Sequence, residues 1–318
     1  MTTDTPVSVR NGPLRISNSE IQTFKDCRRR WWFQYYRNLK PLQQNYTGAL
    51  ALGSRVHAAL DDYYSKGIPL LEAYGNYVEA DREALVSQFR ETVELDTEAE
   101  LGRIMLEGYL AWVDENGIDA ELEMISTEEI ISMPMFGGEV ELQGKLDMRV
   151  RRKADGVRLF RDFKTVGGSF TEFGAMAHMN EQILTYMLLE AANNAEGERC
   201  DGGIFTMLKK VKRTANAKPP FYDQIEVRHN TFALRAFWNR IHGTVKDLLS
   251  VRKELDRGGD HHYLAYPRPS RDCKWKCSFF AVCPLFDDGS AAERAISELY
   301  ASGDPYDYYG STEIKGSE

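Results

Sequence analysis

A chain of 318 residues, 42% hydrophobic and 28% charged, can bury a large core and has the composition of an ordinary soluble globular protein. Its net charge of -8 argues against a protein that coats nucleic acid indiscriminately, because phosphate contacts need positive charge. No apolar run is long enough to span a bilayer, and the first residues lack the apolar stretch of a secretory signal. We therefore expect a cytoplasmic protein without membrane contacts, built as one elaborated domain or two.

The first predicted element is a helix that begins near Asn18. Ser17 and Glu20 form an S-x-x-E capping box, which is typical of a helix N-terminus. Cys27 lies beside the apolar face of this helix, and three arginines and two tryptophans follow it directly. The sequence therefore predicts a cysteine next to a basic, aromatic segment.

Positive charge gathers in three places along the chain, and tryptophans lie in two of them. Aromatic faces among cations suit single-stranded nucleic acid, whose bases can stack on them. The alternative for each group is a solvated basic face with tryptophans in the core. The groups are Arg28 to Arg30 with Trp31, Trp32, Arg37 and Lys40; Lys209, Lys210, Lys212, Arg213 and Lys218; and Arg268, Arg271, Lys274, Trp275 and Lys276.

Helical patterns dominate the next stretch of the chain. A helix over about residues 54–65 carries His57, and a mostly helical region covers about residues 70–115. A lone histidine is more often structural than a metal ligand, so His57 has both interpretations at this point.

A strand pair follows, and it carries three polar groups. Residues 139–150 alternate in polarity, Asp155 and Gly156 predict a turn, and residues 157–165 form the returning strand. With Asp155 and Gly156 as a two-residue loop, Asp147 would face Lys164. Asp162 lies two residues before Lys164 and so projects from the same face. We expect two carboxylates and one amine to converge there.

Two carboxylates and a lysine are the set that a metal-dependent phosphodiesterase needs. Carboxylates are hard oxygen ligands for Mg²⁺ or Mn²⁺, and such a cation neutralises charge that builds on phosphate oxygens. A nearby lysine can orient or deprotonate the attacking water, or stabilise the transition-state charge. The alternative is an exposed, salt-bridged hairpin face.

The remaining elements alternate between helix and strand. A helix over residues 181–192 places Gln182 and Tyr186 on one face, where they could hold a phosphate or brace a site. We expect a strand over residues 203–208, a long amphipathic helix over residues 231–255 and a short helix near residues 291–300. The last dozen residues are polar and we expect them to be disordered.

Four of the five cysteines form a one-plus-three arrangement. Cys27 lies near one end of the chain, and Cys273, Cys277 and Cys283 lie near the other. An odd cysteine count and this spacing argue against disulfides and favour metal ligation. Four thiolates can hold a [4Fe-4S] cluster or a zinc ion. Cys200 has no partner in this arrangement.

In chain order, these motifs resemble the PD-(D/E)xK nuclease superfamily, and within it the RecB-like iron–sulfur exonucleases. That group includes the CRISPR-associated Cas-four type, the AddB nuclease domain and exonuclease V. The matching segments are SNSEIQTFKDCRRRWWFQYY with Cys27, LGSRVHAAL with His57, GKLDMRV with Asp147, DFKT with Asp162 and Lys164, and QILTY with Gln182 and Tyr186. One departure is the three-residue gap between Cys273 and Cys277, where C-x-x-C is commoner.

The resemblance implies a restriction-endonuclease-like α/β core, with a mixed β-sheet flanked by helices. It implies that His57, Asp147, Asp162 and the carbonyl of Phe163 bind Mg²⁺ or Mn²⁺, and that Lys164 acts on the water. Gln182 and Tyr186 would support the site or contact DNA. Cys27, Cys273, Cys277 and Cys283 would hold a [4Fe-4S] cluster that joins the two ends of the chain.

The domain organisation expected from the resemblance is one nuclease domain over residues 17–284. Residues 66–117 would be a helical insertion, residues 17–40 plus 266–284 an iron–sulfur clamp, and residues 285–318 an acidic extension. The leading hypothesis is a metal-dependent DNA exonuclease that acts on single strands or duplex ends, with 5′-to-3′ polarity implied by the resemblance, in recombination, repair or replication. The alternatives are a non-catalytic DNA-binding adaptor in a larger complex, such as one for spacer acquisition, and a zinc-stapled structural protein.

Overall fold

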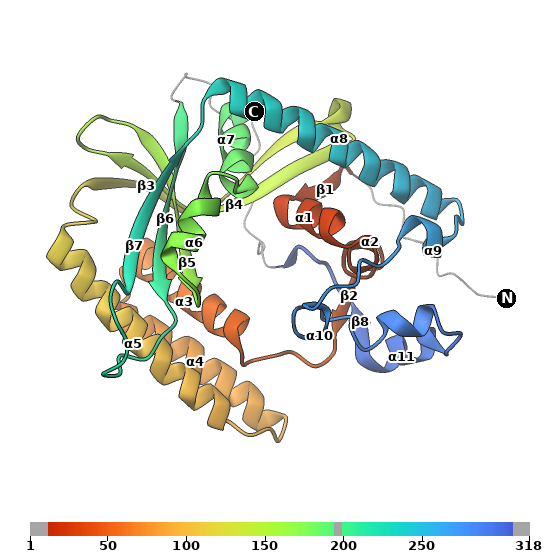
Figure 1. Ribbon diagram of the computed structural model, residues 1–318, viewed down its shortest axis with the longest axis horizontal. Coiled ribbons are helices and arrows are strands. Elements are labelled where there is room, and N and C mark those ends of the chain that lie inside the picture. The colour runs from red at the N-terminus through yellow and green to blue at the C-terminus, as the bar shows by residue number, and fades with distance from the viewer. Residues whose placement is uncertain (1–11, 194–198, 308–318) are drawn as a thin grey trace. The chain divides into compact units, whose positions relative to one another are not determined.

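The computed structural model describes residues 12–193 and 199–307 (Figure 1). The chain divides into two units, each assembled from separate segments: residues 1–44, 132–144 and 235–318 in the first unit, and residues 45–131 and 145–234 in the second. The last dozen residues, for which we expect disorder, lie outside the described part except for Asp307. None of the helices in the described ranges has the length and apolar character needed to cross a membrane.

The first unit begins with strand β1 (Leu14–Ser17), which leads into helix α1 (Asn18–Asp26). The predicted cap is present, because the backbone N–H of Glu20 donates to the hydroxyl of Ser17 over 3.2 Å. Glu20 is buried and accepts from the indole of Trp31 over 2.9 Å. The following elements of this unit are α2 (Arg28–Trp31), a π-helix (Trp32–Tyr36), β2 (Leu39–Pro41), most of α8 (Thr231–Asp256), α9 (His261–Leu264), α10 (Cys273–Lys276), a 3-10 helix (Cys283–Phe286), α11 (Ala292–Leu299) and β8 (Tyr300–Ser302).

Aromatic packing joins the early and late segments of the first unit. The ring of Phe33 stacks on Phe279 with centroids 5.1 Å apart, and the ring of Trp32 meets the edge of Phe286 at 5.3 Å. Strands β2 and β8 pair in antiparallel fashion. Burial of large aromatic rings is a strong source of stability, so this core holds the segment from Trp32 to Pro41 against the region around the C-terminal cysteines.

The strands form a mixed sheet. In the first unit β1 pairs in parallel with the opening residues of β4 (Val140–Arg152). In the second unit the later residues of β4 pair antiparallel with β5 (Arg158–Val166), which pairs in parallel with β6 (Cys200–Lys209); β6 pairs antiparallel with β7 (Tyr222–Arg228). Strand β3 (Leu122–Met135) also pairs with β4.

Helices cover both faces of the sheet in the second unit (Figure 1). Helices α3 (Ala49–Lys66), α4 (Leu70–Ser87) and α5 (Val93–Asn116) share one hydrophobic core with alternate strand residues such as Leu159 and Phe163. Helices α6 (Phe170–Ala177) and α7 (Glu181–Asn193) pack on β7 and β6. Because strand side chains alternate, Phe160, Asp162 and Lys164 point away from the core of α3 to α5.

The register of the β4–β5 hairpin differs from our prediction by two residues. Met148 pairs with Arg161, so continuing the ladder sets Asp147 opposite Asp162 rather than Lys164. The loop is longer than the predicted Asp155-Gly156 pair because Arg152 bonds to Val157 across it. A shift of two keeps every side chain on its predicted face, so the two carboxylates and the lysine still share one face.

Candidate active site and cysteine centre

The Asp-x-Lys pair of β5 meets the polar face of α7. Asp162 is 2% exposed, and its carboxylate lies 2.6 Å from Nζ of Lys164. Gln182 accepts from Lys164 through Oε1 over 3.0 Å and donates through Nε2 to Asp162, also over 3.0 Å. The same Nε2 lies 2.8 Å from the hydroxyl of Tyr186, which donates to the carbonyl of Lys145. The four predicted residues thus form one hydrogen-bonded network.

His57 and Asp147 stand beside this network. Nδ1 of His57 lies 3.5 Å from Oδ2 of Asp147, and that oxygen also accepts from the backbone N–H of Phe163 over 3.2 Å. His57 comes from α3, which passes close to β5 at Gly53. A Cβ at Gly53 would lie only 3.2 Å from Oγ1 of Thr165, so glycine permits the close approach that sets the position of the histidine.

The pKa values of the two aspartates in this site shift in opposite directions. Burial raises the pKa of Asp162, and the nearby charge of Asp147 raises it further in spite of Lys164. Burial also opposes ionisation of Asp147, but His57 and Lys164 outweigh it and hold the pKa below its usual value. Burial lowers the pKa of Lys164, yet the adjacent Asp162 raises it above the usual value. Lys164 is therefore a cation at neutral pH in this arrangement.

A divalent cation fits this donor set. A buried carboxylate that resists ionisation beside a second carboxylate is stabilised when a cation neutralises both. His57, Asp147 and Asp162 offer one imidazole nitrogen and carboxylate oxygens, which suit Mg²⁺ or Mn²⁺ with remaining positions for water and substrate. The site thus has the chemistry for metal-assisted cleavage of a phosphodiester.

The structure adds two carboxylates that our sequence interpretation missed. Asp61 and Glu128 line the same small cavity as His57 and Asp147, together with Phe163 and four other residues. Burial raises the pKa of both Asp61 and Glu128. A signal was available for Asp61, which lies four residues after His57 and so on the same helical face. None was available for Glu128, which comes from the long strand β3.

Lys145 is a further cation beside the site. It lies two residues before Asp147 on β4 and forms an ion pair with Glu128. Its position follows from strand alternation, because residues two apart share a face.

The four cysteines of the one-plus-three arrangement all belong to the first unit. Backbone N–H groups of Arg268 and Ser270 point at Sγ of Cys27 and Cys273, at 3.4 and 3.3 Å. Burial raises the pKa of Cys277, and Cys27 and Cys273 raise it further. Burial likewise raises the pKa of Cys283 to about 11, with Cys27 and Cys277 contributing. The four cysteines are thus half-buried, and neighbouring thiols of the set raise the pKa values of Cys277 and Cys283.

Cys200 lies apart from them, on β6 of the second unit. It is buried, its thiol donates to the carbonyl of Gly202, and burial raises its pKa to about 12. A thiol of that kind is unreactive at neutral pH. This fits its exclusion from the predicted cluster.

The structure buries part of the basic segment after Cys27 and agrees there with the alternative of tryptophans in the core. Arg29 is 1% exposed, and its Nε donates to the carbonyl of Ala265 over 2.7 Å. Trp31 and Trp32 are buried as well. Arg28 forms an ion pair with Asp247. The core interpretation of these tryptophans is the correct one, and Trp275 alone of the three is exposed.

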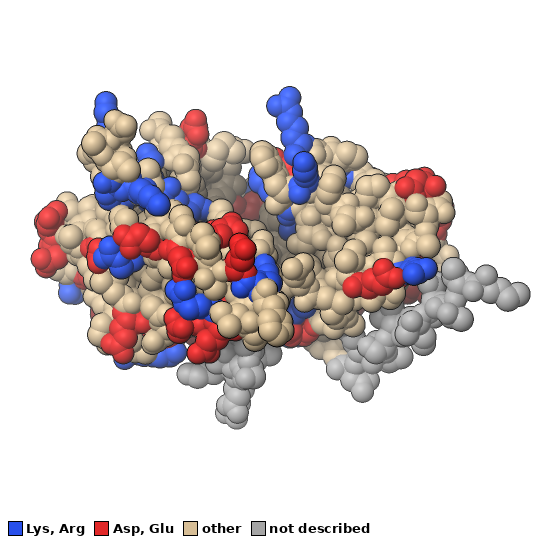
Figure 2. Space-filling model, turned by 90° about the horizontal axis from the view of Figure 1, so that it is seen from below, with Lys and Arg blue, Asp and Glu red and all other residues tan. Residues whose placement is uncertain are grey.

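Basic and acidic side chains intermingle on the face that Figure 2 shows, where no continuous basic surface covers the molecule. This agrees with the net charge of -8.

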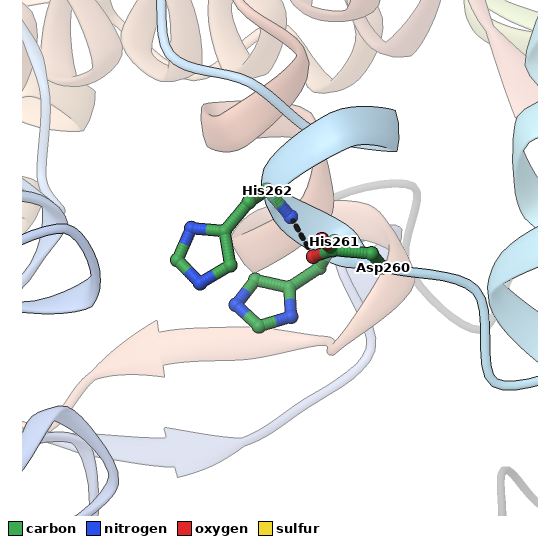
Figure 3. Close-up of side chains that lie close together, drawn as sticks. All are labelled: Asp260, His261 and His262. Carbon is green, nitrogen blue, oxygen red and sulfur yellow. Dashed lines mark hydrogen bonds between the residues drawn. The ribbon is translucent and has the colours of Figure 1, made fainter.

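Another group of potential metal ligands lies in the first unit. In the described ranges, Asp260, His261 and His262 are the group of three His, Cys, Asp or Glu residues whose ligand atoms all lie within 4.8 Å (Figure 3). Asp260 caps α9 by accepting from the backbone N–H of His262 over 2.8 Å. His261 stacks on Trp32 with centroids 4.8 Å apart. These contacts account for Asp260 as a helix cap and for His261 as a packing partner of Trp32.

Comparison with known proteins gives a family and distant structural likenesses. The family model of the PD-(D/E)XK nuclease superfamily matches residues 15–284. Comparison with curated proteins gives no match. A candidate exonuclease from Eubacterium rectale shares 11% identity over 83% of this chain and 93% of its own, with a TM-score of 0.47. An alkaline exonuclease from Laribacter hongkongensis shares 12% identity over 64% and 94%, with a TM-score of 0.32.

These scores are too low for the solved structures to carry an argument about function. The family model covers most of the chain, and it includes the segments that carry His57, Asp147, Asp162, Lys164 and Gln182. The chain therefore belongs to the PD-(D/E)XK nuclease superfamily.

Proposed function

We propose that this protein is a divalent-metal-dependent DNA exonuclease that hydrolyses phosphodiester bonds in single strands or at duplex ends. The observation that best supports this function is the network in which Lys164 and Gln182 hold the buried carboxylate of Asp162 beside Asp147. A surface hairpin would leave these groups solvated, whereas here they are shielded and fixed by two elements. The polarity from 5′ to 3′ and a role in recombination, repair or replication follow the family resemblance.

The proposed roles divide among the residues of the network. His57, Asp147, Asp162 and the carbonyl of Phe163 would hold Mg²⁺ or Mn²⁺, which supplies charge for the phosphate oxygens and acidifies the attacking water. Lys164, held as a cation by Asp162, stabilises negative charge as it grows on the phosphate. Gln182 fixes both groups, and Tyr186 fixes Gln182.

The catalytic proposal is tested on end-labelled single-stranded and duplex DNA with Mg²⁺ or Mn²⁺, using protein purified without oxygen. Replacing a metal-binding carboxylate removes several kcal/mol of transition-state stabilisation, so Asp162→Ala should lower the rate about a thousandfold or more. Glu107→Ala, on the exposed surface of α5, is the control. Release of mononucleotides from one end supports an exonuclease with that polarity.

The second candidate is a DNA-binding adaptor of the same fold that works in a larger complex. The intact Asp147, Asp162 and Lys164 favour catalysis over this role. Wild-type protein that binds DNA but cleaves none, with either metal, would establish the adaptor instead.

The thiolates of Cys27, Cys273, Cys277 and Cys283 are proposed to hold a [4Fe-4S] cluster. A zinc ion at about 2.3 Å from each sulfur needs thiolates roughly 4 Å apart. The one-plus-three arrangement of the four cysteines along the chain favours the cluster over such a zinc ion. Equal amounts of iron and acid-labile sulfide, near four each per chain, would support the cluster; one zinc and no sulfide would establish a zinc staple.

A further inference from the structure

Trp275 is exposed to a degree that is unusual for its residue type. Its exposed fraction is 76%, whereas Trp31 and Trp32 are 0% and 7% exposed. Trp112 and Trp238 are half-buried. Tryptophan is highly buried on average because its large apolar ring gains from leaving water. An indole held in solvent therefore points to a partner that covers it.

The exposed indole is also held in place. Its Nε1 donates to Oδ1 of Asp272 over 3.1 Å, and Oδ2 of Asp272 pairs with Lys276 at 2.5 Å. The ring stands on α10, which begins at Cys273 and ends just before Cys277. A fixed aromatic face costs less entropy on binding than a mobile one, so the position is suited to recognition.

The charges around Trp275 favour an anionic partner. Arg268, Arg271 and Lys274 are exposed, and none of them forms an ion pair within the described residues. Asp272 is already engaged by Lys276 and the indole. A surface that offers an aromatic face and three uncompensated cations matches the bases and phosphates of a single strand.

We propose that Trp275 is a stacking site for an unpaired base of DNA, with Arg271 and Lys274 contacting the adjoining phosphates. The inference rests on the proposed nuclease function and deepens it, because it assigns a substrate contact to the loop that carries the cysteines. Duplex DNA keeps its bases stacked in the helix interior, so the site selects single-stranded segments.

The experiment measures fluorescence anisotropy of a labelled twelve-residue oligo(dT) with Ca²⁺ in place of the catalytic metal. Stacking contributes about 1–3 kcal/mol per base, so Trp275→Ala should weaken binding roughly 5- to 150-fold. Trp275→Phe should restore much of it. Phe232→Ala removes another exposed aromatic ring, on α8, and should bind as the wild type does.

Salt dependence separates stacking from charge. Lys274→Gln should lower the slope of log affinity against log salt by about 0.7, whereas Trp275→Ala should leave it unchanged. Iron content and the far-ultraviolet spectrum of each variant must match the wild type, which excludes loss of the cysteine centre. Intrinsic emission should fall on DNA binding in the wild type and much less in Trp275→Phe.

Two results would overturn the stacking site. One is Trp275→Ala binding within twofold of the wild type; the other is an equal loss of affinity for blunt duplex, which has no unpaired base to stack. Failure of the proposed function looks different, since the wild type would then cleave no end-labelled DNA with either metal, whether or not it binds the oligonucleotide.

Discussion

Gln182 connects the part of the candidate site on β5 with the part on α7. It contacts Lys164, Asp162 and Tyr186 at the same time, but it offers no charge of its own. Its contribution is therefore orientation, and misplacing a catalytic group by about 1 Å can cost a hundredfold in rate.

We expect Gln182→Ala to lower kcat about 10- to 100-fold and to leave the KM for DNA within a few fold, because Asp162 and Lys164 lose a shared partner. Steady-state kinetics on end-labelled DNA checks this. Gln88→Ala, an exposed position at the end of α4, should behave as the wild type. A change in KM alone would contradict the positioning role.

The His57–Asp147 contact gives the metal-free protein a pH-dependent stability. Burial lowers the pKa of His57, but Asp147 outweighs it and raises the pKa above 6.5; His57 and Lys164 hold the pKa of Asp147 below 3.8. The histidine contribution is complete below pH 6.5 and is lost as pH rises through its raised pKa. The aspartate contribution is complete above pH 3.8 and is lost as pH falls.

The difference in thermal midpoint between metal-free wild type and His57→Gln should therefore be largest between about pH 4 and 6.5. It should shrink at higher pH as the imidazolium loses its proton. Differential scanning fluorimetry with a chelator across that range measures it. A difference that grows above pH 7 would contradict the assigned direction.

Helix α1 depends on a local signal that the sequence displays. The hydroxyl of Ser17 is buried and accepts from Glu20, and a serine cap is worth about 1 kcal/mol. We expect Ser17→Ala to lower the free energy of unfolding by that amount, measured by urea denaturation. Ser19→Ala, at an exposed position on the same helix, should change it by only a few tenths.

Local patterns predicted the elements better than they predicted the contacts between them. The capping box, the strand alternation of β4 and the helix of Gln182 and Tyr186 depend on neighbours in the chain, so the sequence contains them. The hairpin register was wrong by two because the ladder continues to Arg152 and Val157, which leaves a longer loop than the predicted pair. Glu128 lies on β3, about twenty residues before Asp147 in the chain, and no local sequence pattern predicts that it lines the site.

At the scale of the molecule, each unit has a complete set of proposed ligands for one centre. His57, Asp147 and Asp162 lie in the second unit, and the four cysteines lie in the first. The two centres are therefore separable by mutation. The order of motifs in the sequence predicted which residues form each set. The burial of Arg29 depends on the distant carbonyl of Ala265, which a linear pattern does not reveal.

We expect Cys277→Ser to abolish iron binding and to speed hydrogen exchange in α1 and α10 of the first unit. Exchange in β5 and β6 of the second unit should change little, because their core lacks the cysteine centre. Mass spectrometry of exchanged peptides gives the comparison. Cys200→Ala is the matched control and should retain its iron.

The wide separation of Cys27 from Cys283 also sets an order of events during synthesis. The ribosome adds roughly 5–20 residues each second. Cys283 is therefore made some 13–50 s after Cys27. Both segments of the second unit are complete before Cys273 is made. A group held by all four thiolates, as proposed, could be inserted only after Cys283 is made, when all the proposed catalytic residues are already present.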